Sequence, residues 1–192
     1  MRVMAVESVT LDGVMQGPGR PDEDTRDGFA HGGWAVPYTD EVMAAAMGER
    51  MARARGALLL GRRTYEDLYG YWPKQPPNPY TEALERSRKH IASRTLAEPL
   101  PWVNSTLIEG DAADAVAALK AEGGGDLTII GSGALVRALA ARGLVDAYLL
   151  LIHPLVLGTG RRLFDSVPDV PLRLTGSVTT TTGVIIADYE TA

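Results

Sequence analysis

The sequence predicts an α/β fold in three layers, with helices on both faces of a mostly parallel sheet that has an antiparallel C-terminal edge. Between residues 57 and 142, apolar runs of strand length alternate with segments of helical period. After Gly143 the alternation stops, and residues 171–181 and 183–190 form two strand-like segments joined by a turn. Strands linked through a helix lie parallel, whereas strands linked by a short turn lie antiparallel, so the two patterns together predict this mixed sheet.

Each element is expected from a local pattern. Residues 2–9 have the composition of a first strand, and residues 10–38 form a long loop rich in Gly, Pro and Asp, of the kind that often carries function. Thr39 caps a helix that runs to about residue 54, because acidic residues occupy its first turn and arginines its end. The alternating part is expected to contain strand 57–60, helix 62–71, helix 79–86, strand 89–93, strand 105–109, a helix from Asp111 to the glycines at 123–125, strand 127–130 and helix 133–142.

Length and composition suit one globular domain over residues 1–192. The formal net charge of -5 gives no support to a nucleic-acid partner. Cysteine is absent, which excludes disulfides and cysteine-based sites, and the three histidines are not spaced as metal ligands. The N-terminus lacks the apolar segment of a signal peptide, and no stretch is long enough to span a bilayer. We therefore expect a cytoplasmic protein without a metal or a membrane partner.

Two strand-to-helix junctions are suited to bind phosphate. At the first, an apolar run ends at Gly61 and meets Arg62, Arg63 and Thr64 where a helix begins. Free N–H groups and partial positive charge at a helix N-terminus attract anions, and a guanidinium group can hold two phosphate oxygens. The second junction, residues 131–133 (Gly-Ser-Gly), follows another apolar run, and its serine is expected to cap the next helix. Each junction alone is also explained as an ordinary turn, but the pair predicts a ligand with several phosphates.

The junctions resemble motifs of a known superfamily. Residues 61–66 look like the Gly-Arg-x-Thr-aromatic-Glu motif of dihydrofolate reductase, residues 130–133 resemble its later Gly-Gly turn, and residues 91–94 resemble its strand that ends in serine. Residues 10–13 (Thr-Leu-Asp-Gly) resemble the Ser-Leu-Asp-Gly signature of the reductase domain of bifunctional riboflavin-biosynthesis deaminase-reductases, and residues 157–164 resemble a Leu-Gly-x-Gly-x-x-Leu-Phe segment of the same superfamily. The resemblance spans essentially the whole chain and implies a dihydrofolate reductase-like fold.

This resemblance implies that the chain binds NADPH. It assigns the two arginines of the first junction to phosphates, the threonine after them to the pyrophosphate, and a serine and an arginine after the third strand to the adenosine. The second junction would flank the pyrophosphate and the nicotinamide half. A 2′-phosphate favours a bidentate arginine, and close approach of backbone to pyrophosphate requires glycine, which favours NADPH over NADH. The residues expected to bind cofactor are Gly61, Arg62, Arg63, Thr64, Ser93, Arg94, Gly131, Ser132 and Gly133.

Two carboxylates are candidates for catalysis. Asp40 follows a Trp-x-x-Pro element that begins at Trp34, and the resemblance implies that a carboxylate near this point anchors a pterin and supports its protonation. An acidic residue in a first helical turn also stabilises the helix without any catalytic role. Asp12 is the rival candidate, although an Asp-Gly pair commonly forms a turn. Both alternatives remain open at the level of sequence.

The expected activity is hydride transfer from NADPH to a pterin-like or pyrimidine-like heterocycle. One alternative is the riboflavin-pathway reductase that acts on 5-amino-6-(5-phosphoribosylamino)uracil, but Ile130 stands where those enzymes have a glutamate, and residues 66–68 replace their Asp-Asp-Pro element. A second alternative is a non-catalytic NADPH-binding module. The apolar run at residues 147–157 is longer than one buried strand needs, and riboflavin-type reductase domains are implied to pair through this region, so we also expect a homodimer.

Overall fold

The structure is a computed structural model, and it describes residues 1–54, 56–123 and 125–192. No helix within these ranges is long and apolar enough to cross a membrane. The strands are β1 (Val3–Thr10), β2 (Ala57–Gly61), β3 (Lys89–Ala92), β4 (Ser105–Ile108), β5 (Leu127–Ile130), β6 (Ala147–His153), β7 (Leu172–Thr179) and β8 (Ile185–Thr191). The α-helices are α1 (Glu41–Arg53), α2 (Arg62–Tyr71), α3 (Pro79–Arg86), α4 (Ala112–Glu122) and α5 (Gly133–Ala140), and the short 3₁₀ helices are η1 (Arg26–Gly28), η2 (Val36–Tyr38) and η3 (Trp72–Lys74).

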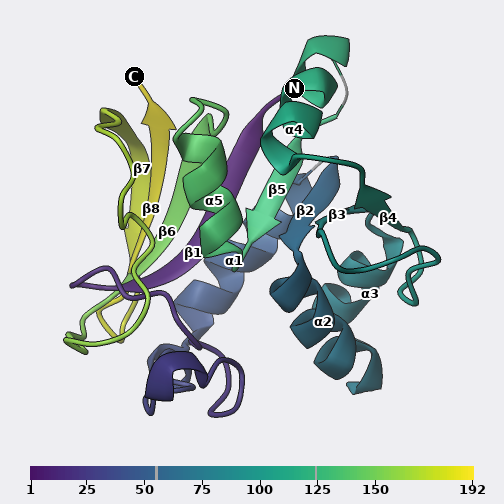
Figure 1. Cartoon of the computed structure of the whole chain (residues 1–192). Helices are drawn as coiled ribbons and strands as arrows, with labels where there is room; N and C mark the ends of the chain where they lie inside the picture. The colour runs from purple at the N-terminus through teal and green to yellow at the C-terminus, as the bar shows by residue number, and fades with distance from the viewer. Residues whose placement is uncertain (55, 124) are drawn as a thin grey trace.

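The eight strands form one sheet in the order β4-β3-β2-β5-β1-β6-β8-β7 (Figure 1). All pairs from β4 to β6 are parallel, whereas β8 pairs antiparallel with both β6 and β7. The predicted fold class, a mostly parallel sheet with an antiparallel C-terminal edge, is confirmed. It follows that the carboxyl ends of β3, β2, β5, β1 and β6 all meet at the same edge of the sheet.

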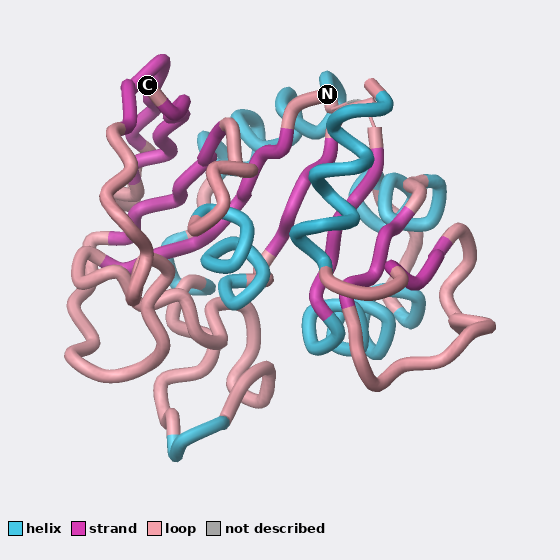
Figure 2. The backbone as a smooth tube through the Cα atoms, turned by 45° about the horizontal axis from the view of Figure 1, so that its top comes forward, coloured by secondary structure: helices cyan, strands magenta, loops and turns pink. Residues whose placement is uncertain are grey.

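Side chains that alternate along each strand hold the helices in two layers. Val3 and Ala5 of β1 pack with residues of α4 and α5, whereas Met4 and Val6 pack on the side of α1. Leu60 of β2 packs with residues of α2 and α3. Helices α4 and α5 therefore cover one face, in front of the sheet in Figure 1, and α1, α2 and α3 cover the other. Figure 2 shows that the long loop after β1 lies at the end of the sheet opposite to both termini.

The predicted start of α1 is wrong by one residue, because Asp40 rather than Thr39 is its N-cap. Oδ1 of Asp40 accepts the N–H of Met43 at 2.7 Å, whereas the hydroxyl of Thr39 donates to the carbonyl of Val36. Helix α4 ends at Gly123, which adopts the left-handed conformation that glycine favours. The predicted glycine stop also included Gly124, which lies outside the described residues.

The apolar run at residues 147–157 has an explanation within the sheet. Its first seven residues form β6, which lies between β1 and β8. Tyr148 and Leu150 pack in the core on the side of α5, and Leu149 and Leu151 pack on the side of α1. A strand covered on both faces is apolar at every position, so no second copy is needed to bury it. The homodimer therefore stays a prediction, and the length of the apolar run no longer supports it.

An opening in the sheet determines where a site can form. Strand β1 pairs with β5 only from Val3 to Val6, but it pairs with β6 from Met4 to Thr10. Past Val6, the β5 side of β1 has no strand partner in the described ranges. Strands β2 and β5 are direct neighbours, so the helices that follow them begin next to each other and next to this opening.

Gly56 determines how closely the segments before β2 and β5 approach each other. Its φ is +109°, and a Cβ atom there would lie 1.8 Å from the carbonyl oxygen of Asp126. We expect Gly56→Ala to lower the free energy of unfolding by on the order of 2–4 kcal/mol, measured by urea denaturation. Gly48→Ala in α1 is the matched control, because nothing lies within 4 Å of its added methyl group, and it should be neutral or stabilise by up to ~1 kcal/mol. Equal stability of the two variants would contradict the close approach.

Candidate functional site

A cavity of about 520 Å³ lies at the carboxyl ends of the strands, beside the unpaired part of β1. Most of its wall comes from the end of β1, the loop that follows it, the first two turns of α2, and the junction between β5 and α5. Single residues of α1, α3, β6 and the loop at Arg161 complete it. Apolar side chains from both helical layers line part of it, and charged side chains line the rest. Its lining includes Val6, Glu7, Ser8, Met15, Gln16, Met47, Arg63, Thr64, Leu68, Gly131, Gly133, Arg137, Leu151 and Arg161.

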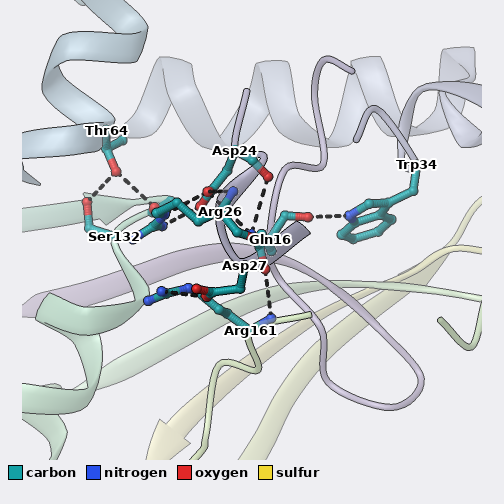
Figure 3. Close-up of polar contacts among 9 residues, drawn as sticks. Gln16, Asp24, Arg26, Asp27, Trp34, Thr64, Ser132 and Arg161 are labelled. Carbon is teal, nitrogen blue, oxygen red and sulfur yellow. Dashed lines mark hydrogen bonds and ion pairs between the residues drawn. The ribbon is translucent and has the colours of Figure 1, made fainter. Parts of the chain in front are cut away.

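The two predicted junctions meet at this cavity and are joined through one side chain. The hydroxyl of Ser132 accepts the N–H of Gly61 at 3.0 Å and lies 3.0 Å from both the hydroxyl of Thr64 and the carbonyl of Ile130. Thr64 in turn donates to the carbonyl of Gly131 at 2.9 Å. Figure 3 shows the contact between Thr64 and Ser132. Ser132 stands at the N-cap position of α5, but its side chain does not cap that helix as predicted, because it binds the other junction instead.

The two arginines of the first junction differ in their surroundings. Arg62 forms an i,i+4 ion pair with Glu66 at 3.6 Å and does not line the cavity. Arg63 lines the cavity and has no hydrogen bond or ion pair with any described residue. In addition, no side chain from the described ranges caps the N-terminus of α2. An unpaired guanidinium group beside free helical N–H groups is a suitable arrangement for a phosphate.

Two glycines of the second junction are required for different reasons. Gly131 has a φ of +58°, a left-handed conformation that side chains with a Cβ adopt only with strain. Gly133 has an ordinary φ, but a Cβ atom there would lie 2.1 Å from the Sδ of Met15. Met15 therefore packs directly on the first residue of α5, at the wall of the cavity. Gly133, at which the sequence predicts close approach of a ligand, therefore also leaves room for the side chain of Met15.

Ser93 and Arg94 follow β3, at the same edge of the sheet as the first junction. The hydroxyl of Ser93 accepts the N–H groups of Thr95 and Leu96, which forms a turn, and neither residue is part of the cavity wall. Arg94 is exposed and has no polar partner in the part of the chain that the structure describes. Their assignment to an adenosine stays a prediction.

The two predicted catalytic carboxylates lie outside the cavity wall. Asp40 caps α1 and also accepts from the hydroxyl of Thr181 at 2.6 Å and the N–H of Thr182 at 3.1 Å. Asp12 accepts from the hydroxyl of Thr10 at 2.6 Å and from backbone N–H groups of the loop at residues 157–158. In each case a side-chain hydroxyl is the main cause that lowers the pKa of the carboxyl to about 2. These contacts hold loops together, and catalytic roles for both remain predictions.

Sequence reasoning missed Glu7, which lines the cavity from β1. Its side chain is 3% exposed, and Oε1 accepts the N–H of Ser132 at 3.2 Å. Burial is the main cause that raises the pKa of this carboxyl to about 8, against the opposing effects of the Ser132 N–H and the charge of Arg137. The signal was present in the sequence: Glu7 occupies the face of β1 whose other residues, Val3, Ala5 and Val9, are buried and apolar. An ionisable group on such a face is costly unless something binds it.

The loop after β1 is fixed over the cavity by the side chain of Gln16, which is buried. Its Nε2 donates to the carbonyl of Arg26 at 3.0 Å, and its Oε1 accepts the N–H of Arg161 at 3.0 Å. The carbonyl of Gln16 accepts the indole N–H of Trp34 at 2.7 Å. Arg161 also pairs with Asp27, as Figure 3 shows. Two loops far apart in sequence are thereby held together at one side of the cavity.

The donors at the cavity suit an organic phosphate rather than a metal ion. Arg63, the free N–H groups of α2 and the glycine backbone at Gly131 present positive charge and backbone donors at one edge. Among the described residues, no three His, Asp or Glu side chains are close enough to hold a metal ion. The arrangement can therefore bind an anionic ligand at the junctions and a flat apolar group against the apolar part of the wall, which includes Met47, Leu68 and Leu151.

The chain is similar to known proteins over almost its whole length. A family model described as the RibD C-terminal domain matches residues 2–186. The uncharacterized protein YyaP of Bacillus subtilis (strain 168) is 31% identical over 199 residues, which cover 98% of this chain and 94% of that protein.

Three solved structures share the fold. A putative riboflavin biosynthesis protein from Shewanella sp. PV-4 has a TM-score of 0.70 at 20% identity, with 100% of this chain and 99% of that chain covered. A pyrimidine reductase-like protein from Corynebacterium diphtheriae has a TM-score of 0.67 at 16% identity, with coverages of 100% and 92%. Dihydrofolate reductase from Enterococcus faecalis, complexed with NADP(H) and RAB-propyl, has a TM-score of 0.57 at 14% identity, with coverages of 99% and 94%. The predicted resemblance is confirmed.

The Ser132 hydroxyl should contribute to stability because it satisfies a backbone donor of the other junction. We expect Ser132→Ala to lower the free energy of unfolding by about 1–3 kcal/mol, since Gly61 N–H loses its acceptor. Ser105→Ala is the matched control, because the Ser105 hydroxyl oxygen is buried without a hydrogen-bond partner, and it should be neutral or stabilising. Denaturant unfolding of both variants measures the difference. A larger loss in Ser105→Ala than in Ser132→Ala would show that the junctions do not depend on this bond.

The raised pKa of Glu7 makes stability depend on pH in a defined direction. Because the pKa rises from 4.5 in the unfolded chain to about 8 in the fold, the folded state holds a proton that the unfolded state has lost between these values. The stabilisation is complete below about pH 4.5 and is lost as the pH rises to about 8. We expect Glu7→Gln to remove a decline on the order of 5 kcal/mol over this range, measured by thermal unfolding. Glu66→Gln, at an exposed position, should keep the wild-type decline; the same decline in Glu7→Gln would refute the assignment.

Proposed function

The chain belongs to the RibD C-terminal domain family, and from this membership we propose that it is an NADPH-dependent reductase that transfers a hydride to a pterin-like or pyrimidine-like heterocycle. The observation that carries the proposal is the meeting of both strand-to-helix junctions at one cavity, with Arg63 unpaired at its wall. A bound nicotinamide dinucleotide would supply the hydride. The chain's own residues would bind its phosphates, orient its ring and exclude water from the reacting atoms.

The charged wall of the cavity supports a cofactor with a phosphate group. Thr64 and the backbone at Gly131 would hold the pyrophosphate, and Arg62 and Arg63 would hold the 2′-phosphate, with Ser93 and Arg94 beside the adenosine. Arg62 keeps only a partly exposed ion pair with Glu66, which a phosphate can replace at small cost because such pairs contribute little. The dihydrofolate reductase of similar fold from Enterococcus faecalis was solved with NADP(H), and the same cofactor class is proposed for this chain.

The apolar part of the cavity wall is suited to a flat heterocycle as the substrate. Met47, Leu68 and Leu151 provide apolar contacts, and Glu7 and Ser8 bring polar groups from the end of β1. Sites for small ligands commonly combine apolar walls with a few such polar groups. We place the substrate against these apolar side chains because the proposed phosphate donors lie at the two helix starts.

Two alternatives differ in what they predict. A riboflavin-pathway pyrimidine reductase is favoured by the likeness to the pyrimidine reductase-like protein from Corynebacterium diphtheriae, and it would reduce a ribosylated aminouracil. A non-catalytic module would bind NADPH but would not oxidise it in the presence of any heterocycle tested. Incubation of the wild-type protein and NADPH with a panel of pterins, dihydropterins and aminouracils separates the three outcomes by the loss of nicotinamide absorbance.

Replacement of both arginines tests the cofactor assignment. We expect Arg62→Ala with Arg63→Ala to weaken NADPH binding by about 2–4 kcal/mol and to change NADH binding little, because the lost charge-assisted bonds reach the 2′-phosphate. Fluorescence titration with each cofactor measures the affinities. Arg53→Ala is a matched control, since Arg53 forms the same kind of exposed i,i+4 pair with Glu49 on α1. Equal losses for both cofactors would contradict the assignment, and the single variants Arg62→Ala and Arg63→Ala divide the effect between the two positions.

A further inference from the structure

Resting on the proposed reductase function, we propose that Glu7 is a catalytic residue: its carboxyl group protonates the ring nitrogen of a cyclic imine whose neighbouring carbon receives the hydride. The proposal names both the acid and the substrate class. It depends on where the Glu7 side chain lies, on which of its atoms are already bonded, and on the absence of a better-placed acid in the described part of the cavity wall.

The Glu7 carboxyl has one oxygen fixed and one oxygen available. Oε1 accepts the N–H of Ser132, so the group is held against the N-terminus of α5. Oε2 has no hydrogen-bond partner among the described residues, and Glu7 forms part of the cavity wall. Oε2 is not among the described side-chain atoms that are fully buried without a partner, so it reaches the open space of the cavity. A ligand with a hydrogen-bond acceptor at this point can therefore accept the proton of the neutral carboxyl.

The environment sets Glu7 to carry a proton at neutral pH and to release it during the reaction. Burial raises its pKa to about 8, which keeps the carboxyl neutral before transfer. The Ser132 N–H and the positive charge of Arg137 act in the opposite direction and stabilise the carboxylate that transfer leaves behind. Arg137 forms no close ion pair with Glu7, since its guanidinium group donates to the carbonyl of Arg162. The pKa thus lies near the working pH, as general acid catalysis requires.

The reaction balances with the groups named. The bound cofactor would supply the hydride, two electrons and one hydrogen nucleus, that forms a C–H bond at the imine carbon. The C=N π electrons would move to nitrogen, and that nitrogen would take the proton of Glu7 to form N–H, which completes the two-electron reduction of the imine to a secondary amine. The Glu7 carboxylate then regains a proton from solvent, so one proton is consumed in each turnover.

Other carboxyls of the cavity wall are already bonded to described residues. Glu23 has a raised pKa, mainly through burial, but its Oε2 accepts two N–H groups of its own loop, at Gly19 and Arg20. Asp24 pairs with Arg26 on the same loop. Asp67 of α2 pairs with Arg20, and Glu66 pairs with Arg62. Arg161, another cation of the wall, pairs with Asp27. Arg137 is the charged side chain that lowers the pKa of Glu7.

A binding experiment tests the proton on Glu7 without turnover. The probe is 7,8-dihydrobiopterin, which contains a cyclic imine, bound in the presence of NADP⁺ so that no hydride can transfer. We expect the wild-type affinity for the probe to fall by up to about tenfold between about pH 6.5 and about pH 9, as the neutral donor is lost. Glu7→Gln should bind with an affinity that does not change with pH, because its amide donates a hydrogen bond at every pH. Glu23→Gln is the matched carboxyl control and should keep the wild-type pH dependence.

A wild-type affinity that does not change with pH, or an equal decline in Glu7→Gln, would overturn the proposal. The infrared carbonyl band of a protonated carboxyl gives a second readout. It should be present in wild type at pH 7, absent from Glu7→Gln, and shifted when the probe binds. A band that is unchanged by the probe would overturn the direct contact.

A kinetic experiment separates the acid from the proposed function. In single-turnover reduction of the probe by NADPH, Glu7→Gln should be at least ~100-fold slower than wild type, while its affinity for NADPH stays within about threefold. Glu7→Asp, which keeps an acid on a shorter side chain, should be intermediate. Full rate in Glu7→Gln, or failure of the wild type to reduce the probe while it binds NADPH, would overturn the assignment of acid and substrate class. Failure of the wild type to bind NADPH at all would instead overturn the proposed function.

Discussion

The hydroxyl group of Ser132 is the contact on which the site depends, because it joins two helix starts that the chain separates by about seventy residues. It accepts a backbone N–H from the end of β2 and lies within hydrogen-bond distance of Thr64 on α2 and of the end of its own strand. A serine at this position would ordinarily cap its own helix. Here it leaves that role open and fixes the relative position of the two junctions, so that donors from both helices converge on one volume before any ligand is present.

Glu7 completes the junction from the opposite side. Its carboxyl accepts the N–H of Ser132 itself, which keeps that N–H satisfied inside the fold. A charged carboxylate at this place would cancel part of the positive field that an anionic ligand needs. A neutral carboxyl satisfies the N–H and keeps the field, and burial favours the neutral form. The same burial therefore supports anion binding and acid chemistry at neighbouring points of one helix terminus.

The sequence predicted the fold class because periodicity and short turns determine strand direction, and both are local. The junctions at Gly61 and Gly131 were also local signals, since a glycine between an apolar run and a helix start is visible in the chain. The partners of Ser132 were not predictable, because its own helix and the other junction compete for the hydroxyl and only the adjacency of β2 and β5 decides the outcome. Glu7 left a local signal, an ionisable residue on an otherwise apolar strand face, but that signal does not distinguish a buried structural carboxyl from a residue of a cavity wall. The opening beside Glu7 comes from the pairing of β1 with its two neighbours over different lengths, and no local pattern encodes that difference.

The contacts of Gln16 affect the thermodynamics of ligand binding. Its amide joins the carbonyl of Arg26 to the N–H of Arg161, so the loop over the cavity takes its shape from bonds within the protein. A loop that orders only around its ligand loses conformational entropy at the moment of binding, and the measured affinity is reduced by that amount. Here the ordering entropy is already spent during folding, so calorimetry of a ligand entering this cavity should record little entropic penalty from the loop. Selectivity then arises from the fit of the ligand to a preformed wall rather than from closure around it.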